Sequence, residues 1–412
     1  MQSVYPIDLT DIVTAAQLSI EHAMAPHAPV DAQKNVPITK AAIESVLNGE
    51  ITSHTHPETT PLPIITTWVP DLYLDRPPAG FAPCIADDKT DNSAAFLALA
   101  NEATKRHCHL VLPYGKTQVN KFDLTGRKGV VLKGSGSKVC ILKQTPKQES
   151  DLAFLSVIKD VNGKVIDWHA DCCGLSDIGL EGNYGQIGMF SLLKIAGVNG
   201  CTKFENLYLY NGGHGITFDN QSYCWIYNIH NIWINQMRGR GINGVGTDNS
   251  LHTIDISGTQ DDCVYASGAN CRLFNFKIMG SKTKSGLRVK GSRLTIFGFD
   301  CQESFDDGVV FEDGYDCTIT GLNCDNNGIN YPLGSPWQVR TPRVSYGVNI
   351  KSGEHCTVTD YNFSNRNSTF LPGIAGVYIS SSAQHYRVRM NDERNPYGIS
   401  VNNSLTSIIE RN

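Results

Sequence analysis

The sequence contains no run of apolar residues long enough to span a membrane and no helical pattern long enough to cover the face of a sheet. Its first 24 residues include Asp8, Asp11 and Glu21 and lack the basic segment and apolar core of a signal peptide, so we expect the chain to fold in a cytoplasm. Only 18% of the residues are charged, the net charge is −5, and no basic stripe stands out. These absences argue against membrane insertion and against a nucleic-acid partner.

The thirteen cysteines are an odd number, and many of them recur at one position of a repeated pattern. This distribution is typical of reduced, buried thiols and not of a disulfide framework. Cys172 and Cys173 are adjacent and lack the intervening residues that usually separate two zinc ligands.

A short pattern recurs seven times in the second half of the chain: a small residue, an alternating apolar and polar run, a polar turn, and a second alternating run. The copies begin at Gly215, Gly241, Cys263, Gly286, Gly308, Gly347 and Gly376, with a frayed eighth copy at Gly398. Most copies lie 22–26 residues apart, and the longer gaps before Gly347 and Gly376 indicate loops outside the repeat. Short strands at this period, stacked coil on coil, predict an all-β, right-handed, single-stranded parallel β-helix.

One position in the turns of these copies predicts an inward-facing ladder of side chains. Its members are Cys201, Cys224, Cys271, Leu294, Cys317, Cys356 and His385.

Residues 1–80 differ from the repeats and predict an attachment and linker region, with the β-helix domain spanning residues 81–412. Residues 9–24 and 39–47 are amphipathic and favour helices, and proline and threonine dominate residues 52–70. His54 and His56 face the same way on an extended chain, so three chains around an axis could present six imidazoles to one structural metal ion. The alternative is a solvated polar linker.

Residues 85–93 read IADDKTDNS and are followed by an alanine-rich helical run at 94–104 and by HLVLPYGKT at 109–117. These segments resemble the opening of the pectin-lyase-like β-helix superfamily, with Asp88 in place of the first glycine of its turn. The resemblance implies a helix that caps the open end of the solenoid, which would otherwise leave an unpaired strand edge.

That superfamily includes polygalacturonases, pectate lyases and bacteriophage tailspikes, and the layout of this chain resembles a tailspike most. The resemblance implies a homotrimer, attachment to a phage tail or baseplate through the N-terminal region, and a location in the virion tail. It also implies a bacterial capsular polysaccharide or lipopolysaccharide as the ligand. The histidine pair resembles the metal-binding His-x-His of some phage spike proteins.

The residue before each copy defines a column that we expect to lie on one solvent-exposed wall. Its members are His214, Arg240, Asp262, Ser285, Asp307, Tyr346, Ala375 and Tyr397, and the neighbouring position supplies Asp261, Lys284 and Asp306. Aspartates also fill β-helix turns for purely structural reasons. Four acidic side chains stacked on one face nevertheless favour a catalytic site, because like charges repel and raise one another's pKa.

Cleavage of a glycosidic bond needs an acid and a second carboxylate, and it needs no cofactor. Asp262 and Asp307 are two coils apart, about 9–10 Å by backbone spacing, which favours an inverting hydrolase. Residues 260–264 read QDDCV and resemble the GDDCVAI of polygalacturonases, which implies that Asp261 and Asp262 hold the hydrolytic water. The GHG of that signature is missing one coil later, so we predict Asp261, Asp262, Asp306 and Asp307 as the catalytic set.

The groups around this column suit a saccharide. We expect substrate binding by His214, Arg240, Lys284, Arg288, Glu303 and Trp337. The sequence thus predicts a tailspike endoglycosidase. A polysaccharide lyase that uses His214, Lys284 and Arg288, or a spike that binds glycan without cleaving it, remains an alternative.

Overall fold

The chain divides into two compact units, Met1–Trp68 and Val69–Asn412. A computed structural model of the chain describes residues 71–146, 148–167, 172–183, 188–197, 199–200, 202–219, 225–226, 229–330, 341–342, 345–364, 374–394 and 400–411. The helices predicted at 9–24 and 39–47 and the predicted metal ligands His54 and His56 lie outside the described residues. The first strand, β1 (Leu72–Tyr73), already pairs with β3 (Leu110–Val111), ahead of the domain boundary predicted at residue 81.

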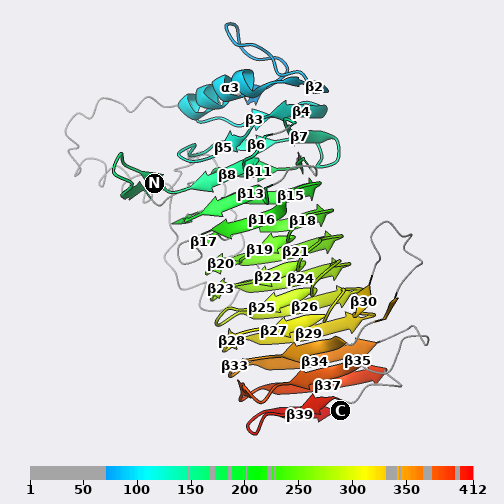
Figure 1. Cartoon of the computed structure of the whole chain (residues 1–412). Coiled ribbons are helices and arrows are strands. Elements are labelled where there is room, and N and C mark those ends of the chain that lie inside the picture. The colour runs from blue at the N-terminus through cyan, green and yellow to red at the C-terminus, as the bar shows by residue number, and fades with distance from the viewer. Residues whose placement is uncertain are drawn as a thin grey trace, which may run out of the picture. The chain divides into compact units, whose positions relative to one another are not determined.

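The second unit is a parallel β-helix, which confirms the fold class predicted from the repeats (Figure 1). Its long sheet has 17 strands. They are β1, β2 (Asp87–Asp91), β3, β4 (Gly115–Val119), β6 (Val131–Lys133), β7 (Cys140–Gln144), β11 (Gly174–Ser176), β12 (Gly179–Glu181), β15 (Lys203–Tyr210), β18 (Ile229–Asn235), β21 (Ser250–Ser257), β24 (Arg272–Met279), β26 (Thr295–Gln302), β29 (Thr318–Asp325), β34 (Thr357–Ser364), β37 (Arg387–Arg394) and β39 (Ile408–Arg411).

A second sheet of 11 strands forms another wall of the helix. Its strands are β5 (Phe122–Asp123), β8 (Ala153–Ser156), β13 (Ser191–Ala196), β16 (His214–Asp219), β19 (Ile242–Asn243), β22 (Val264–Ala266), β25 (Leu287–Val289), β27 (Val309–Phe311), β32 (Ser345–Ile350), β35 (Ile374–Ile379) and β38 (Val401–Asn402). Short strands complete the coils and their excursions: β9 (Ile158–Lys159) with β10 (Val165–Asp167), β14 (Asn199–Gly200) with β17 (Trp225–Ile226), β20 (Gly246–Thr247) with β23 (Gly268–Ala269), β28 (Gly314–Tyr315) with β33 (Gly353–Glu354) and β36 (Ala383–Gln384), and β30 (Ile329–Asn330) with β31 (Thr341–Pro342).

The two long gaps between repeats do not interrupt the pairing of the second sheet. Val309 and Val348 are direct neighbours in the second sheet although 39 residues separate them, and Val348 then pairs with Val377. The first of these gaps carries the antiparallel pair of β30 and β31. Register in the stack is therefore independent of loop length.

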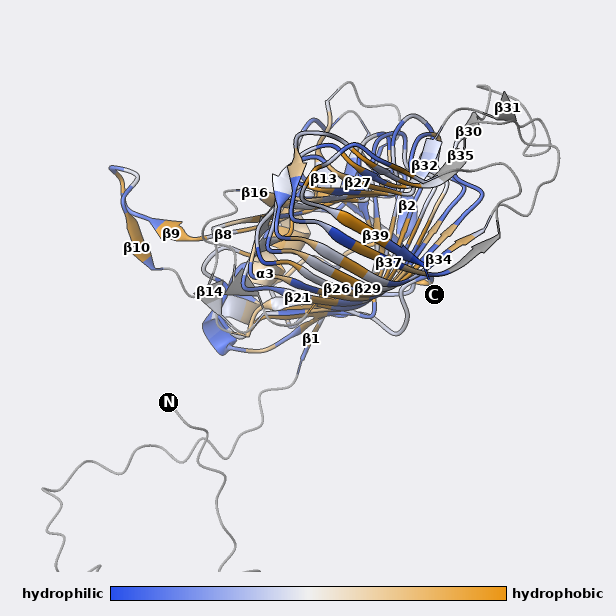
Figure 2. Ribbon diagram, turned by 90° about the horizontal axis from the view of Figure 1, so that it is seen from below, coloured by the Kyte–Doolittle hydropathy of each residue, from blue (hydrophilic) through white to orange (hydrophobic). Residues whose placement is uncertain are grey.

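The core lies between the sheets, where alternate apolar residues of the strands are buried. Figure 2 shows hydrophobic and hydrophilic residues following one another along the ribbon of these strands. Ile216, Val264 and Val309 of the second sheet are completely buried. The glycine that begins most copies is required by the close approach of the next coil. A Cβ added at Gly215, for example, would lie 2.5 Å from the carbonyl oxygen of Gly241.

The predicted ladder is inward-facing, but its last member was wrong. Register pairs Thr318 with Thr357 and Thr357 with Arg387, so the residue facing Cys356 is Tyr386 and not His385. Tyr386 is buried, whereas His385 is exposed. The turn after Val377 is one residue longer than the turn after Val348, which moves His385 out of the core.

The cysteines follow the prediction of reduced, buried thiols. All eleven in the described ranges are free, and all but Cys172 are buried. Cys201 and Cys224 lie outside those ranges.

The helix α3 (Ser93–Arg106) lies at the N-terminal end of the stack, where the sequence predicted a capping helix (Figure 1). It buries Phe96, Leu99, Ala100 and Ala103. Asn92 at its N-cap makes no side-chain capping bond, because its side chain binds the backbone of Ile85 and Thr90. In the part of the chain that the structure describes, no helix is long and apolar enough to cross a membrane.

Candidate active site

The register of the second sheet places the predicted column residues one above another. Ile216, Ile242, Val264, Leu287, Val309 and Val348 pair in succession along this sheet. The residues two positions earlier are His214, Arg240, Asp262, Ser285, Asp307 and Tyr346. Successive members are therefore about 4.8 Å apart along the stack. The wall is less open than predicted, because Asp262 is only 1% exposed and Asp307 only 8%.

Asp262 is engaged in a buried ion pair. Arg288 donates from Nε to Oδ2 at 2.8 Å and from Nη2 to Oδ1 at 3.1 Å, and the Ser285 amide donates to Oδ1 at 3.1 Å. Burial raises the pKa of the Asp262 carboxyl, and the bonds from Arg288 oppose that rise. Proton transfer at Asp262 would break a two-pronged pair, so its geometry suits the positioning of Arg288 better than acid–base work.

Asp307 lies two coils further along, and among the described residues the hydrogen bonds to its two oxygens come from neutral donors. The Tyr346 amide donates to Oδ1 at 2.7 Å, and Asn349 Nδ2 donates to Oδ2 at 2.8 Å. Burial raises the pKa of Asp307, and the nearby Asp306 adds to the rise. The two hydrogen bonds and the charge of Lys351 oppose it without cancelling it. Asp307 is therefore the carboxyl in this column whose surroundings favour the protonated form.

Arg240 contacts both Asp262 of the column and Asp261 of the neighbouring position. Its Nε lies 3.3 Å from Asp261 Oδ2 and 3.9 Å from Asp262 Oδ2, and its Nη1 donates to Asn243 Oδ1 at 2.7 Å. The guanidinium also lies over the ring of Tyr265, 4.1 Å from its centre. These contacts fix a cation beside the partly exposed carboxylate of Asp261.

His214 is held as a neutral imidazole. Its Nδ1 accepts the amide proton of Arg240 at 2.9 Å, and burial, followed by the charge of Arg240, lowers its pKa. With Nδ1 acting as acceptor, the ring proton sits on Nε2. His214 can donate a hydrogen bond through Nε2, but that nitrogen is not a base.

The other predicted residues are spread around this column. The Asp306 amide donates to the Lys284 carbonyl oxygen at 3.1 Å, which places Lys284 and Asp306 on adjacent coils of the neighbouring position. Glu303 lies before this position, at the corner that follows the long sheet, with a left-handed φ of 52°. Trp337 lies outside the described residues.

The outward-facing position three residues after the column holds further residues, of which the sequence predicted only Arg288. Register aligns Asn243, Tyr265, Arg288, Val310, Asn349 and Tyr378 there. Tyr346 stacks on Tyr378 with ring centres 4.9 Å apart, next to Asp307. Counting three residues on from each column member would have found them.

Three buried polar atoms near Asp307 lack a hydrogen-bond partner among the residues that are described: Ser285 Oγ, Ser345 Oγ and Asn349 Oδ1. Buried polar atoms are usually paired, and these three could bind hydroxyl groups or water. Within the same ranges, no cluster of three His, Cys, Asp or Glu residues is arranged to hold a metal ion.

No model of a protein family matches the sequence, and no curated protein matches it. Among solved structures, the fold is similar to the A-module of the mannuronan C-5 epimerase AlgE4 of Azotobacter vinelandii, with a TM-score of 0.61 and 14% identity over 80% of this chain and 92% of that one. The AlgE6 A-module of the same organism gives a TM-score of 0.52 and 11% identity over 83% of this chain and 99% of that one.

A further similar structure is tailspike protein 2 of an Escherichia coli O157:H7 bacteriophage. The TM-score is 0.55 and the identity 14%, over 78% of this chain and 44% of that one, so the chain spans less than half the length of that tailspike. Likeness at such identities extends to the fold alone. The chain thus shares its parallel β-helix fold with this tailspike and with the epimerase modules.

Proposed function

We propose that this chain is a phage tailspike, or receptor-binding protein, with endoglycosidase activity on a bacterial capsular polysaccharide or lipopolysaccharide. The observation that carries the proposal is the environment of Asp307, a buried carboxyl with neutral donors and a raised pKa in a column that also holds Arg240 and Asp262. The fold shared with a tailspike supports it. Homotrimer assembly, attachment to the phage tail through residues 1–80, location in the virion tail and a metal ion at His54 and His56 belong to the same proposal.

In the proposed reaction, Asp307 gives its proton to the leaving glycosidic oxygen. Asp261, which lies beside Arg240, activates a water molecule on the opposite side of the sugar ring. The two residues are two coils apart, about 9–10 Å along the backbone, which suits inversion, where the carboxyl groups are about 6.5–9.5 Å apart. Asp262 keeps Arg288 in place, and the Tyr346–Tyr378 stack offers an aromatic surface to the sugar.

The lyase alternative is disfavoured by His214. A lyase needs a base that removes a proton from the sugar, and the Nδ1 of His214 already accepts a backbone proton. Lys284, the other candidate base, is exposed on the neighbouring position.

The test is to incubate the full chain with a panel of purified bacterial capsular polysaccharides and lipopolysaccharide glycans and to count new reducing ends. We expect reducing ends without growth of ultraviolet absorbance, and a first product of inverted anomeric configuration by NMR. Absorbance growth on a uronate-containing glycan would identify a lyase. Tight binding to a glycan without new reducing ends would leave a binding spike and overturn the hydrolase.

A further inference from the structure

The N-terminal coils carry a charged network on the outer face of the long sheet, away from the column of Asp262 and Asp307. Lys143 Nζ lies 2.6 Å from Asp88 Oδ1, and Lys116 Nζ lies 2.9 Å from Glu181 Oε2. Each lysine also approaches the other carboxylate at 3.7 Å. Two carboxylates and two ammonium groups balance one another, so the network presents no net charge.

A pocket of about 540 Å³ adjoins this network, within the size range of small-ligand sites. Asp88 belongs to both, and the pocket is further lined by Asp91, Gln118, Asn120 and Thr145. These amides, carboxylates and hydroxyl, together with the ammonium group of Lys89, offer donors and acceptors side by side. Such a lining matches the paired hydroxyl groups of a sugar better than it matches an apolar or a strongly charged ligand.

An aromatic surface continues from the network along the same face. Tyr210 donates a hydrogen bond to Glu181 and stacks on Tyr208 with ring centres 4.8 Å apart, and Tyr208 lies 5.3 Å from Trp233. Lys138 Nζ lies 3.8 Å from the centre of a Trp233 ring, and this indole is still 40% exposed. Burial and Glu181 raise the pKa of Tyr210 well above its usual range, so its hydroxyl remains a donor.

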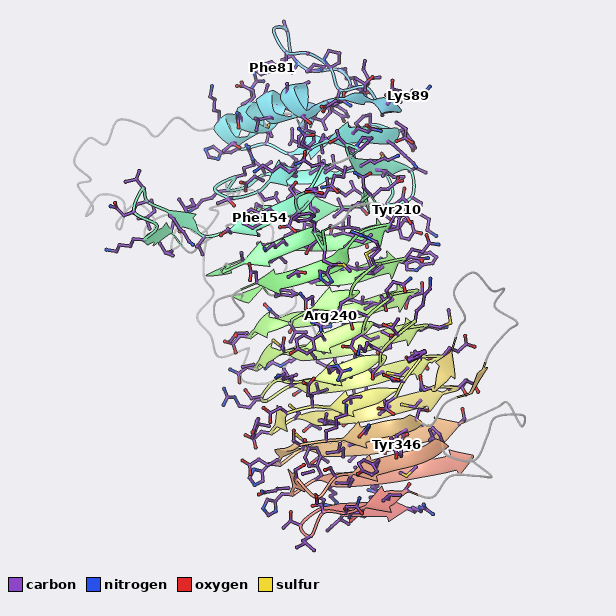
Figure 3. The ribbon with its side chains drawn as sticks, in the orientation of Figure 1. Phe81, Lys89, Phe154, Tyr210, Arg240 and Tyr346 are labelled. Carbon is purple, nitrogen blue, oxygen red and sulfur yellow. The ribbon has the colours of Figure 1, made fainter. Side chains whose placement is uncertain are left out.

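The register makes the pocket and the aromatic surface one continuous strip. Gln118, Lys143, Glu181 and Tyr210 pair in succession on four neighbouring strands, and on the fifth strand Trp233 pairs with Tyr208, two residues before Tyr210. Four steps of about 4.8 Å give a strip about 19 Å long, enough for several sugar rings. Figure 3 shows Lys89 of the pocket rim and Tyr210 towards the N-terminal end of the stack, with Arg240 and Tyr346 further along it.

We infer that this strip is a second saccharide-binding site, which takes a neutral oligosaccharide with its sugar hydroxyls in the pocket of Gln118 and Asn120 and a sugar ring against Trp233. Aromatic faces are favourable contacts for the apolar faces of sugars, and amide and carboxylate groups bind hydroxyl pairs. Because its charges balance, the network offers no excess cation to an anionic glycan. The site does not depend on the proposed hydrolysis, because none of its residues belongs to the Asp262 and Asp307 column.

The test uses the full chain carrying Asp307→Asn, so that no probe is cleaved, on an array of neutral and anionic bacterial oligosaccharides. We expect binding to neutral members that falls about tenfold in Trp233→Ala and in Asn120→Ala. The matched control is Phe297→Ala. Phe297 is an aromatic residue on the same sheet, is 50% exposed and lies outside the strip, so this variant should bind the neutral members as before.

Binding that survives both strip variants, binding to anionic members alone, or no binding at all would each overturn the second site. The hydrolase proposal is tested separately, by counting the reducing ends that the protein with an intact Asp307 releases. Its failure would leave the array result unchanged. Circular dichroism of each variant shows that a lost signal does not come from a lost fold.

Discussion

Asp262 and Asp307 occupy the same position of the repeat two coils apart, yet their surroundings differ in one decisive way. Asp262 faces the guanidinium of Arg288, whereas Asp307 faces the amide of Asn349 and the backbone of Tyr346. Arg288 and Asn349 themselves hold equivalent places on the outward-facing position of their coils. The difference between Arg288 and Asn349 therefore makes Asp262 the ion-pair partner of an arginine and leaves Asp307 available to hold a proton.

This comparison indicates how a solenoid builds a site. The repeat decides where a side chain stands, because backbone register is the same in every coil. The residue on the adjoining position decides what that side chain does, because its charge and hydrogen bonds set the pKa.

The largest effect should follow Asp307→Asn. The amide keeps the shape and can keep most hydrogen bonds but cannot protonate a leaving group, so we expect turnover on the cleaved glycan to fall by about 10²–10⁴-fold. Reducing-end assays measure this, with Asp316→Asn as the control, since Asp316 lies on the same coil and its side chain is 61% exposed. Activity within a few-fold of the unaltered protein would remove Asp307 from the acid role.

The next largest effect is on the stability of the fold and tests the ion pair of Asp262. Removing its partner by Arg288→Ala leaves a buried carboxylate without its hydrogen-bonded cation, and Arg240 Nε at 3.9 Å only partly replaces it. The loss should lower the free energy of unfolding by about 3–5 kcal/mol. Denaturant unfolding measures the loss. The control is Lys290→Ala. Lys290 follows the same strand as Arg288, is more exposed, and approaches Glu312 at 3.7 Å. Its removal should lower the free energy of unfolding by less than about 1 kcal/mol. Equal losses in the two variants would contradict the ion-pair role of Asp262.

The two carboxyls can also be separated by pH. The pKa of Asp307 in the folded protein lies above its ordinary value of 3.8, so its contribution to stability is greatest below that pH and is lost as the pH rises through the folded pKa. Relative to Asp307→Asn, the unaltered protein should lose about 1.4 kcal/mol of stability for each pH unit by which the pKa is raised. A difference between the two proteins that is flat from pH 4 to about pH 7 would contradict this.

A smaller effect is expected at the aromatic stack beside Asp307. Tyr378→Ala removes the partner of Tyr346 and should weaken substrate binding by about 0.5–1.5 kcal/mol, a several-fold rise in KM with little change in kcat. Tyr315→Ala is the matched control, because Tyr315 is 41% exposed on another wall. A fall in kcat with an unchanged KM would indicate that the stack orients the acid instead of the sugar.

Much of the architecture could be predicted because the repeat period and the alternation of apolar residues determine the coil. The column from His214 to Tyr346 followed from counting along the copies. The exposure of His385 could not be predicted. One additional residue in the turn exchanges the inward-facing and outward-facing positions, and the sequence does not mark where that residue is inserted. The partners of Asp262 and Asp307 were also out of reach, because Arg288 is 26 residues away and Asn349 is 42 residues away across a long loop.

The central claim is that Asp307 holds a proton where Asp262 holds a cation, and the titration of the Asp307 carboxyl carbon by NMR tests it most directly. The resonance is assigned as the one that disappears in Asp307→Asn. Our account predicts a midpoint clearly above 3.8. A midpoint at or below that value would contradict the account, because Asp307 would then be ionised and unable to serve as the acid.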